Sequence, residues 1–282
     1  MASLPSIRLG LIGDNIKRSK SPLLHTLAGG MCGLDIRYDT LIPAELDCGF
    51  EAVFERCRSI GYRGINVTYP YKEKVVAFLD IDDPRVAAIG ACNTVLFEAH
   101  GACGFNTDYS GFSAAFRAAF PDSNPGIVAM AGAGGVGKAI GFALADLDAS
   151  ALHLFDQDLS KAKALKNAFE DTAAETVVSI HETIEDAVAG ADGLINCTPL
   201  GMIGHPGTAF PKSLLGLQRW AFDAVYTPVE TEFLKNASGC GLEAISGYEL
   251  FLHQGIDAFQ IFTGRTVNIA ALRKKLLEPI QI

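Results

Sequence analysis

The second half of the chain alternates short apolar runs with stretches whose apolar positions fall three and four residues apart. The first pattern predicts buried strands and the second predicts helices packed along one face. Strands are expected at residues 127–131, 151–155, 176–180, 193–197, 220–226 and 243–245. Helices are expected after a glycine-rich turn at 132–137, and at 160–169, 184–188, 248–262 and 269–277. A regular alternation of strand and helix favours a parallel sheet.

The first half follows a less regular order. Strands are expected at residues 7–12, 37–41 and 64–68, followed by two short strands at 93–98 and 104–106 that a turn at His100-Gly101 joins. Helices are expected from Pro22 to about Met31, and at 44–60, 71–79 and 108–120. The segment 121–125 is rich in turn-forming residues. The pattern therefore predicts an α/β protein of two domains with a boundary near residue 122.

The glycine-rich turn carries the most specific pattern in the chain. Gly132, Gly134 and Gly137 stand at Gly-x-Gly-x-x-Gly spacing between an apolar strand and a helix, with Gly135 and Val136 inside the loop. This context fits a dinucleotide-binding turn, in which the first glycine permits the turn, the second admits a pyrophosphate and the third lets helix and strand pack closely. The N-terminus of the following helix also attracts phosphate.

The following strand ends at Asp156, 24 positions after Gly132. An acidic residue about 20 positions after the glycines is expected to bind a ribose diol. Two alternatives remain for the turn. Gly132, Gly137 and Lys138 also fit a phosphate loop for a nucleoside triphosphate, although Ala139 replaces the hydroxyl residue that holds magnesium. The glycines could also form a turn without a ligand.

Bulk properties narrow the range of partners. The 282 residues are 49% apolar and 20% charged, which is ordinary for a globular protein. A net charge of -9 without clustered basic residues argues against nucleic acid as a partner. We see neither a signal peptide nor a membrane-spanning run, and the seven cysteines contain no Cys-x-x-Cys pair, so a cytoplasmic protein with reduced thiols and no membrane partner is expected. The six histidines show no metal-ligand spacing, so no metal is expected.

Several polar residues of the first half stand next to expected strand ends. The hydroxyls of Ser19 and Ser21 could bind a carboxylate or a polyol, although capping of the next helix by Ser21 is slightly favoured. Lys72 is expected in a first helical turn, where its charge opposes the helix dipole, so it is either solvated or placed for another purpose. Asp108 could cap its own helix. If it meets Lys72, the two would form a pair that handles protons.

Taken together, the motifs resemble those of the shikimate dehydrogenase family over almost the whole chain. They occur in the family's order and are Ser19-Lys-Ser21-Pro22, Asn66-Val-Thr68-Tyr-Pro70-Tyr-Lys72, Gly90-Ala-Cys-Asn93-Thr94, Gly104-Phe-Asn106-Thr107-Asp108, Gly132-Ala-Gly134-Gly-Val-Gly137, Asn196-Cys-Thr198-Pro199-Leu-Gly201-Met202, Asp223-Ala-Val-Tyr226-Thr-Pro228 and Gln254-Gly-Ile-Asp-Ala-Phe259. The resemblance implies a substrate-binding catalytic domain with a mixed sheet at 1–122 and a Rossmann domain at 123–264. It also implies a last helix, at about 265–282, that returns to the first domain. The active site would lie in the cleft between the domains.

The resemblance also implies roles for individual residues. Lys72 would be the catalytic base, with Asp108 beside it. The substrate would be held by Ser19, Ser21, Thr68, Asn93, Asp108, Tyr226 and Gln254. The cofactor would contact the glycine loop (Gly132, Gly134, Gly135, Val136 and Gly137), Asp156, Thr198, Met202, Val225 and Gly247.

The implied reaction is hydride transfer between a nicotinamide dinucleotide and a small cyclic polyol carboxylate such as shikimate or quinate. The pattern looks nearest to the quinate/shikimate and aminoshikimate-type branch. Many NADP-using members carry Asn-Arg-Thr where this chain has Asp156-Gln157-Asp158, so NAD is the expected cofactor and NADP a weaker one. Many members also carry Gly-Met where Glu249-Leu250 stand here. A monomer or a homodimer is expected.

Overall fold

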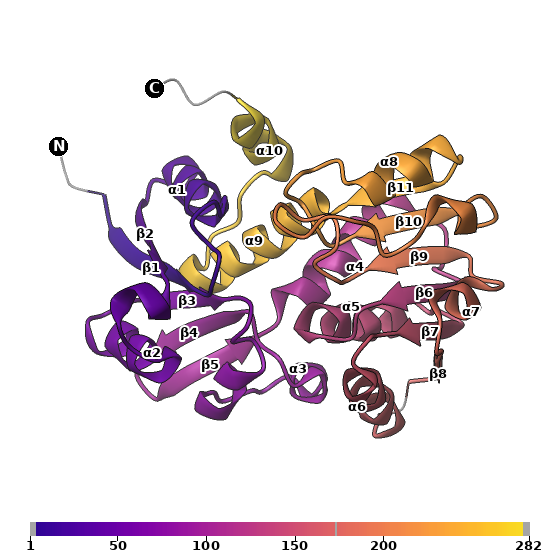
Figure 1. The fold of residues 1–282 in the computed structure, drawn as a ribbon. Helices are drawn as coiled ribbons and strands as arrows, with labels where there is room; N and C mark the ends of the chain where they lie inside the picture. The colour runs from indigo at the N-terminus through magenta and orange to yellow at the C-terminus, as the bar shows by residue number, and fades with distance from the viewer. Residues whose placement is uncertain (1–3, 173, 279–282) are drawn as a thin grey trace. The chain divides into compact units, whose positions relative to one another are not determined.

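The computed structural model describes residues 4–172 and 174–278, and the chain in it divides into two compact units. The first unit contains the residues up to Thr107 together with those from Gln254 onward. The second unit is the continuous segment Asp108–His253. Figure 1 shows that each unit contains a sheet of its own.

The sheet of the first unit is mixed, as the family resemblance implies. Its strand order is β2-β1-β3-β4-β5, in which β1 runs parallel to β2 and β3 while the pairs β3–β4 and β4–β5 are antiparallel. The strands are β1 (Ser6–Ile12), β2 (Asp35–Leu41), β3 (Gly64–Val67), β4 (Thr94–Glu98) and β5 (Gly101–Phe105).

Helices cover both faces of this sheet. The helices of this unit are α1 (Ser21–Met31), α2 (Phe50–Ser59), α3 (Pro84–Ile89), the second half of α9 (Gly247–Thr263) and α10 (Ile269–Leu277), with two 3₁₀ helices, η1 (Pro43–Leu46) and η2 (Lys74–Phe78). On one face, Phe54 of α2 packs edge-on against Phe97 of β4 at 5.4 Å. On the other, a side chain at Gly64 would lie 2.5 Å from the ring of Phe262, so this glycine lets α9 pack directly on β3. α10 contacts α1.

Among the helices of the first unit, three differ from the sequence prediction. The expected helix at 44–60 is broken into η1 and α2, because Asp47 has a φ of 50° in the left-handed region and Gly49 then serves as the N-cap of α2. The expected helix at 71–79 is the shorter 3₁₀ helix η2. The pattern gave no helix at α3, although the carboxylate of Asp83 caps its first turn and Pro84 opens it.

The second unit contains a parallel sheet of the doubly wound kind, as predicted. Its strand order is β11-β10-β9-β6-β7-β8. The strand order reverses between β6 and β9, which are parallel neighbours. The strands are β6 (Ile127–Ala131), β7 (Ala151–Phe155), β8 (Val177–Ile180), β9 (Gly193–Asn196), β10 (Trp220–Asp223) and β11 (Glu243–Ser246). The helices are α4 (Thr107–Ala119), α5 (Gly135–Asp146), α6 (Leu159–Glu170), α7 (Ile184–Val188) and α8 (Glu232–Gly239), with the 3₁₀ helix η3 (Lys212–Leu214).

Aromatic packing assigns α4 to this second unit. Phe112 meets Phe222 of β10 edge-on at 4.9 Å, and Phe116 meets Trp220 at 5.1 Å. A side chain at Gly193 would lie 2.1 Å from the indole of Trp220, so the neighbouring strand must carry glycine to seat it. The change of unit therefore falls at the start of α4, whereas the sequence pattern placed a boundary after it, near residue 122.

The helix α9 is shared by the two units, since its residues up to His253 belong to the second and those from Gln254 to the first. Its second half is packed against α1, where a side chain at Gly255 would lie 2.6 Å from Leu24. Among the residues that the structure describes, no helix is long and apolar enough to cross a membrane.

Candidate active site

The glycine turn between β6 and α5 is closed on its inner side and open on its outer side. Gly132 has a φ of +97°, and a side chain there would lie 2.8 Å from the carbonyl carbon of Cys197. A side chain at Gly137 would lie 2.1 Å from the carbonyl oxygen of Gly132. At Gly134, by contrast, a Cβ would meet no atom within 4 Å. This combination fits a phosphate group held against the N-terminus of α5.

Asp156 lies beside the same turn. One of its carboxylate oxygens accepts the N–H of Ala133 at 2.7 Å, and the other accepts the N–H of Asp158 at 2.8 Å. The carboxylate therefore braces the glycine turn from the end of the neighbouring strand β7. This position suits the ribose-binding role expected from the sequence.

The loop after β9 is organised by the side chain of Asn196. Its oxygen accepts both the N–H and the hydroxyl of Thr198, at 2.9 and 2.7 Å. Its NH₂ group donates to the carbonyl of Leu200 at 3.0 Å and to the carboxylate of Asp223 at 2.9 Å. Asn196 thus fixes the loop that carries Thr198 and Met202, two of the expected cofactor contacts, to the end of β10.

Asp223 is a fully buried carboxylate at that strand end. It accepts hydrogen bonds from the Asn196 amide, from the Thr231 hydroxyl at 2.6 Å and from the Val225 N–H at 3.0 Å. Burial raises the pKa of Asp223 to about 6, while these three donors act in the opposite direction. Neither Asn196 nor Asp223 was expected as a site residue. They are neighbours because β9 and β10 pair in parallel with Asn196 opposite Asp223.

The start of α9 packs against the loop after β10. A side chain at Gly247 would lie 2.6–2.7 Å from the carbonyl oxygens of Asp223, Ala224 and Val225. Glycine is therefore required if α9 is to begin here. Tyr226, an expected substrate contact, stacks on Phe251 of α9 at 5.1 Å.

In the first unit, Ser19 and Ser21 lie together, as their spacing suggests. The Ser19 hydroxyl donates to the Ser21 hydroxyl at 3.1 Å and accepts the Ser21 N–H at 3.2 Å. The helix α1 begins at Ser21, its N-cap is Lys20, and no side chain caps it. The favoured alternative, in which Ser21 serves as the helix cap, is therefore wrong.

Lys72 lies in the turn that leads into η2 and is partly buried. Its carbonyl accepts the N–H of Cys92 at 2.8 Å, which anchors it beside the segment that carries Asn93. The preceding residue, Tyr71, donates its hydroxyl to Asp14 at 3.1 Å and stacks on Phe50 at 4.8 Å. The backbone at Lys72 is thus held on both sides.

Thr68 and Asn93 stand at the ends of neighbouring segments of the same unit. The N–H of Thr68 donates to Ile12, and a side chain at Gly13 would lie 2.3 Å from the Thr68 methyl, so glycine makes room for the threonine. The amide oxygen of Asn93 accepts the N–H of Thr107 at 2.7 Å.

The hydroxyl of Thr107 joins two expected substrate contacts. It lies 3.1 Å from the amide oxygen of Asn93 and 3.4 Å from that of Gln254, and its single proton can serve only one of them at a time. Thr107 itself was not expected as a site residue. Asp108 is buried in the first turn of α4, with 6% of its surface exposed. Since Lys72 and Asp108 belong to different units, their pairing stays a prediction.

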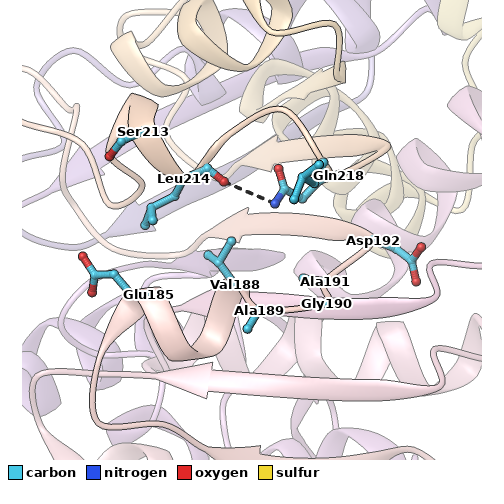
Figure 2. Close-up of a pocket in the computed structure, with 10 residues that line it drawn as sticks. Glu185, Val188, Ala189, Gly190, Ala191, Asp192, Ser213, Leu214 and Gln218 are labelled. Atoms are coloured by element: carbon cyan, nitrogen blue, oxygen red, sulfur yellow. Dashed lines mark hydrogen bonds between the residues drawn. The ribbon is translucent and has the colours of Figure 1, made fainter.

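A groove of about 400 Å³ lies at the other end of the second unit's sheet (Figure 2). It is bounded by the segment that leads into β9 and by the loop around Leu214 and Gln218, whose side-chain amide donates to the Leu214 carbonyl at 3.2 Å. The glycine turn follows the opposite, C-terminal end of the central strand. The groove is therefore separate from the residues expected to bind the cofactor.

Comparisons with known proteins place these residues in context. The model of the shikimate dehydrogenase substrate binding domain matches residues 11–95. The model of the shikimate 5'-dehydrogenase C-terminal domain matches residues 247–277. The first match covers Ser19 to Asn93, and the second covers Gly247 and Gln254.

Whole-length relatives are also similar. A quinate/shikimate dehydrogenase (NAD(+)) from Corynebacterium efficiens is 37% identical over 278 residues, which cover 96% of this chain and 98% of that protein. A shikimate dehydrogenase (NADP(+)) from Streptomyces avermitilis is 38% identical over 92% of this chain and 91% of its own. The solved structure of quinate dehydrogenase from Corynebacterium glutamicum in complex with NAD has a TM-score of 0.89 at 36% identity, covering 97% of this chain and 99% of that one.

Proposed function

Because the chain belongs to the shikimate dehydrogenase family, we propose that it transfers hydride reversibly between a nicotinamide dinucleotide and a cyclic polyol carboxylate of the shikimate or quinate class. The observation that carries this proposal is the glycine turn, whose tight inner side at Gly132 and Gly137 and open outer side at Gly134 suit a pyrophosphate. The proposal predicts a small-molecule substrate and a cytoplasmic enzyme, as a monomer or a homodimer.

The second unit would hold the cofactor. The pyrophosphate would lie against the glycine loop, including Gly135 and Val136, and Asp156 would accept the ribose hydroxyls. Thr198, Met202, Val225 and Gly247 would line the part of the site nearer the nicotinamide. When bound, the nicotinamide supplies the hydride acceptor or donor.

The first unit would hold the substrate and carry the proton transfer. Lys72 would accept the proton of the substrate hydroxyl in oxidation and return it in reduction, and Asp108 would hold the ammonium in place. Ser19 and Ser21 would bind the carboxylate. Further hydroxyls would meet Thr68, Asn93, Tyr226 and Gln254. For Asn93 this leaves its NH₂ group as the ligand contact, because its oxygen is already used by Thr107.

Two other functions start from the same glycine turn. A phosphate-loop nucleotidase would need a hydroxyl residue after Lys138, and Ala139 is instead fully buried in α5. A dinucleotide sensor on the same fold would bind cofactor without turnover. Titration with NAD, NADP and ATP separates the first of these from the proposal, and turnover separates the second.

The direct test is a spectrophotometric assay that crosses quinate and shikimate with NAD and NADP. We expect turnover with at least one of the two acids, and higher kcat/KM with NAD. If neither acid were turned over with either cofactor while NAD still bound, the sensor would be the better description. If the protein bound ATP but neither NAD nor NADP, the phosphate-loop nucleotidase would be the better description.

The serine pair predicts a selective loss of substrate affinity. Ser19→Ala and Ser21→Ala should each raise the KM for the acid substrate by about 10- to 100-fold, since a hydrogen bond to a charged group is worth about 1.5–3 kcal/mol. The Kd of the cofactor should not change. As a matched control, Ser110→Ala alters a serine outside the pair. A loss of cofactor affinity with an unchanged KM would show that this loop does not bind the carboxylate.

Asp156 predicts a preference for NAD. Its carboxylate suits the ribose hydroxyls, whereas the 2′-phosphate of NADP would bring a like charge against it. There is one alternative, in which Asp156 only caps a turn and Lys161 binds that phosphate. The Lys161 ammonium is exposed and lies 3.9 Å from Asp158. We expect the parent protein to have a higher kcat/KM with NAD than with NADP, whichever acid is the better substrate.

A charge-only change tests the role of Asp156 itself. Asp156→Asn keeps an oxygen that can accept the Ala133 N–H and removes the charge, so the NAD-to-NADP ratio of kcat/KM should fall. Asp158→Asn is the control, because it removes a neighbouring charge that caps α6. Equal or higher values with NADP in the parent protein would contradict the preference, and an unchanged ratio in Asp156→Asn would exclude this residue from the choice.

A further inference from the structure

The hairpin of β4 and β5 brings three unlike metal-binding side chains together on the surface of the first unit. Glu98 ends β4, His100 lies in the turn, and Cys103 is on β5. In the register of the hairpin, Glu98 faces Gly101 and Leu96 faces Cys103. Since alternate residues of a strand share a face, Glu98 and Cys103 lie diagonally on the same side of the hairpin.

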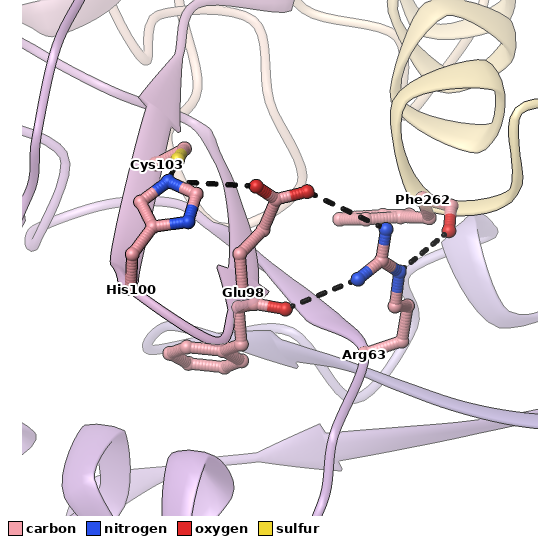
Figure 3. A network of polar contacts seen from close by, with 6 residues as sticks. Arg63, Glu98, His100, Cys103 and Phe262 are labelled. Carbon is pink, nitrogen blue, oxygen red and sulfur yellow. Dashed lines mark hydrogen bonds and ion pairs between the residues drawn. The ribbon is translucent and has the colours of Figure 1, made fainter.

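The donor atoms of these side chains converge on one point (Figure 3). The Nε2 atom of His100 lies 3.6 Å from a carboxylate oxygen of Glu98 and 3.9 Å from the sulfur of Cys103. All three donor atoms lie within 4.8 Å of one another. No other group of three such side chains is brought together in this way in residues 4–172 and 174–278.

These separations are close to those of a tetrahedral zinc site. With zinc–nitrogen and zinc–oxygen bonds of about 2.0–2.1 Å and a zinc–sulfur bond of about 2.3 Å, tetrahedral angles place nitrogen and sulfur about 3.6 Å apart and nitrogen and oxygen about 3.3 Å apart. The two observed distances from Nε2 exceed these values by about 0.3 Å each. Small rotations of exposed side chains close such a gap without any movement of the hairpin backbone.

The guanidinium of Arg63 orients the carboxylate of Glu98. Its second oxygen lies 3.7 Å from the guanidinium of Arg63, which also donates to the carbonyls of Phe97 at 3.2 Å and Phe262 at 3.3 Å. Figure 3 shows this guanidinium on the side of the carboxylate away from His100. A partner that fixes a ligand from its far side is a regular feature of protein metal sites.

The surrounding charge favours a cation. A side chain at Gly101 would lie 2.6 Å from a carboxylate oxygen of Asp80, so that carboxylate stands beside the turn. The negative charges of Glu98, Asp82 and Asp80 all act on the sulfur of Cys103. Three carboxylates therefore act here against the single guanidinium of Arg63.

We propose that Glu98, His100 and Cys103 form a binding site for Zn²⁺, with a water molecule as the fourth ligand on the exposed side. Nitrogen, sulfur and a single carboxylate oxygen are the donors that zinc prefers, whereas Mg²⁺ and Ca²⁺ prefer oxygen alone. The site lies at the end of β4 opposite Asn93, so it is separate from the candidate active site. It does not depend on the proposed function.

The test is zinc binding by the purified full-length protein. In competition with a chromophoric chelator, we expect the parent to bind one Zn²⁺ that excess Mg²⁺ does not displace. His100→Ala and Cys103→Ser should each weaken zinc binding by more than about 10-fold. Loss of a residue that only supports a ligand already lowers metal affinity by about 10- to 100-fold. Cys32→Ser is the matched control, because it changes a partly exposed cysteine that donates only to the carbonyl of Thr266, at 3.6 Å.

Substitution with Co²⁺ identifies the ligand directly and does not depend on the variants' stability. The parent and Cys32→Ser should show an intense thiolate-to-cobalt charge-transfer band, and Cys103→Ser should lack it. A bound zinc should also raise the Tm of the parent, because the metal binds only the folded hairpin. The proposal fails if the parent binds no zinc, if the cobalt band is absent, or if zinc affinity is the same in Cys103→Ser as in Cys32→Ser.

Discussion

Replacing Lys72 with alanine should lower kcat by about 10²–10⁴, the usual contribution of a positioned general base. The loss should appear in kcat rather than in the Kd of the cofactor, because the ammonium is expected to act on the substrate hydroxyl. The surrounding backbone should survive the change, since the carbonyl of Lys72 and the ring of Tyr71 make the contacts that hold this turn. Steady-state kinetics and cofactor titration measure the two effects separately.

Lys74 provides the matched control for this experiment. It lies two positions further along, is half exposed and pairs with Glu51 at 2.7 Å. Lys74→Ala removes the same charge from the same segment and should leave kcat within a fewfold of the parent. If Lys72→Ala behaved like Lys74→Ala, Lys72 would not be the base, and a protein that binds dinucleotide without turnover would again be a serious alternative.

Replacing Asp223 with alanine should lower the free energy of unfolding by about 2–5 kcal/mol. The carboxylate is costly to bury, as its raised pKa indicates, but its removal strands the Asn196 amide, the Thr231 hydroxyl and the Val225 N–H. A buried donor left without an acceptor costs about 1–3 kcal/mol, and water that enters the space recovers part of that cost. Urea denaturation at pH 7 measures the change.

Asp192 is the comparison residue for Asp223. It also sits beside β9, accepts the N–H of Ile127 at 2.9 Å and lies 3.4 Å from Arg219, but 40% of its side chain is exposed. Asp192→Ala should therefore cost much less than Asp223→Ala. Equal losses would mean that the brace between Asn196 and Asp223 adds nothing beyond an ordinary strand-end contact.

Local patterns predicted the parts of the fold that depend on neighbours in sequence. The glycine turn is an example, because Gly137 has to leave room for the carbonyl oxygen of Gly132 within the same turn. The start of α1 follows in the same way from Pro22, which lies in its first turn. The parallel sheet of the second unit followed from the order of strands and helices alone.

Contacts between distant segments could not be predicted from spacing. Asn196 and Asp223 are 27 residues apart and meet only because β9 and β10 become neighbours in register. Thr107 is placed against Gln254 by the return of α9, a separation of 147 residues. The spacing of the histidines does not reveal the cluster of Glu98, His100 and Cys103, because the hairpin register decides which side chains share a face.

The split assignment of α9 has a consequence for the order in which the protein is made and folds. The second unit is continuous in sequence, so all of its strands are available once residues up to His253 have left the ribosome. The first unit is discontinuous in sequence. Gly64 and Leu24 stay uncovered until Phe262 and Gly255 of α9 have been synthesised. The segment translated first is therefore completed last. During synthesis it presents an uncovered apolar surface for as long as the second unit takes to emerge.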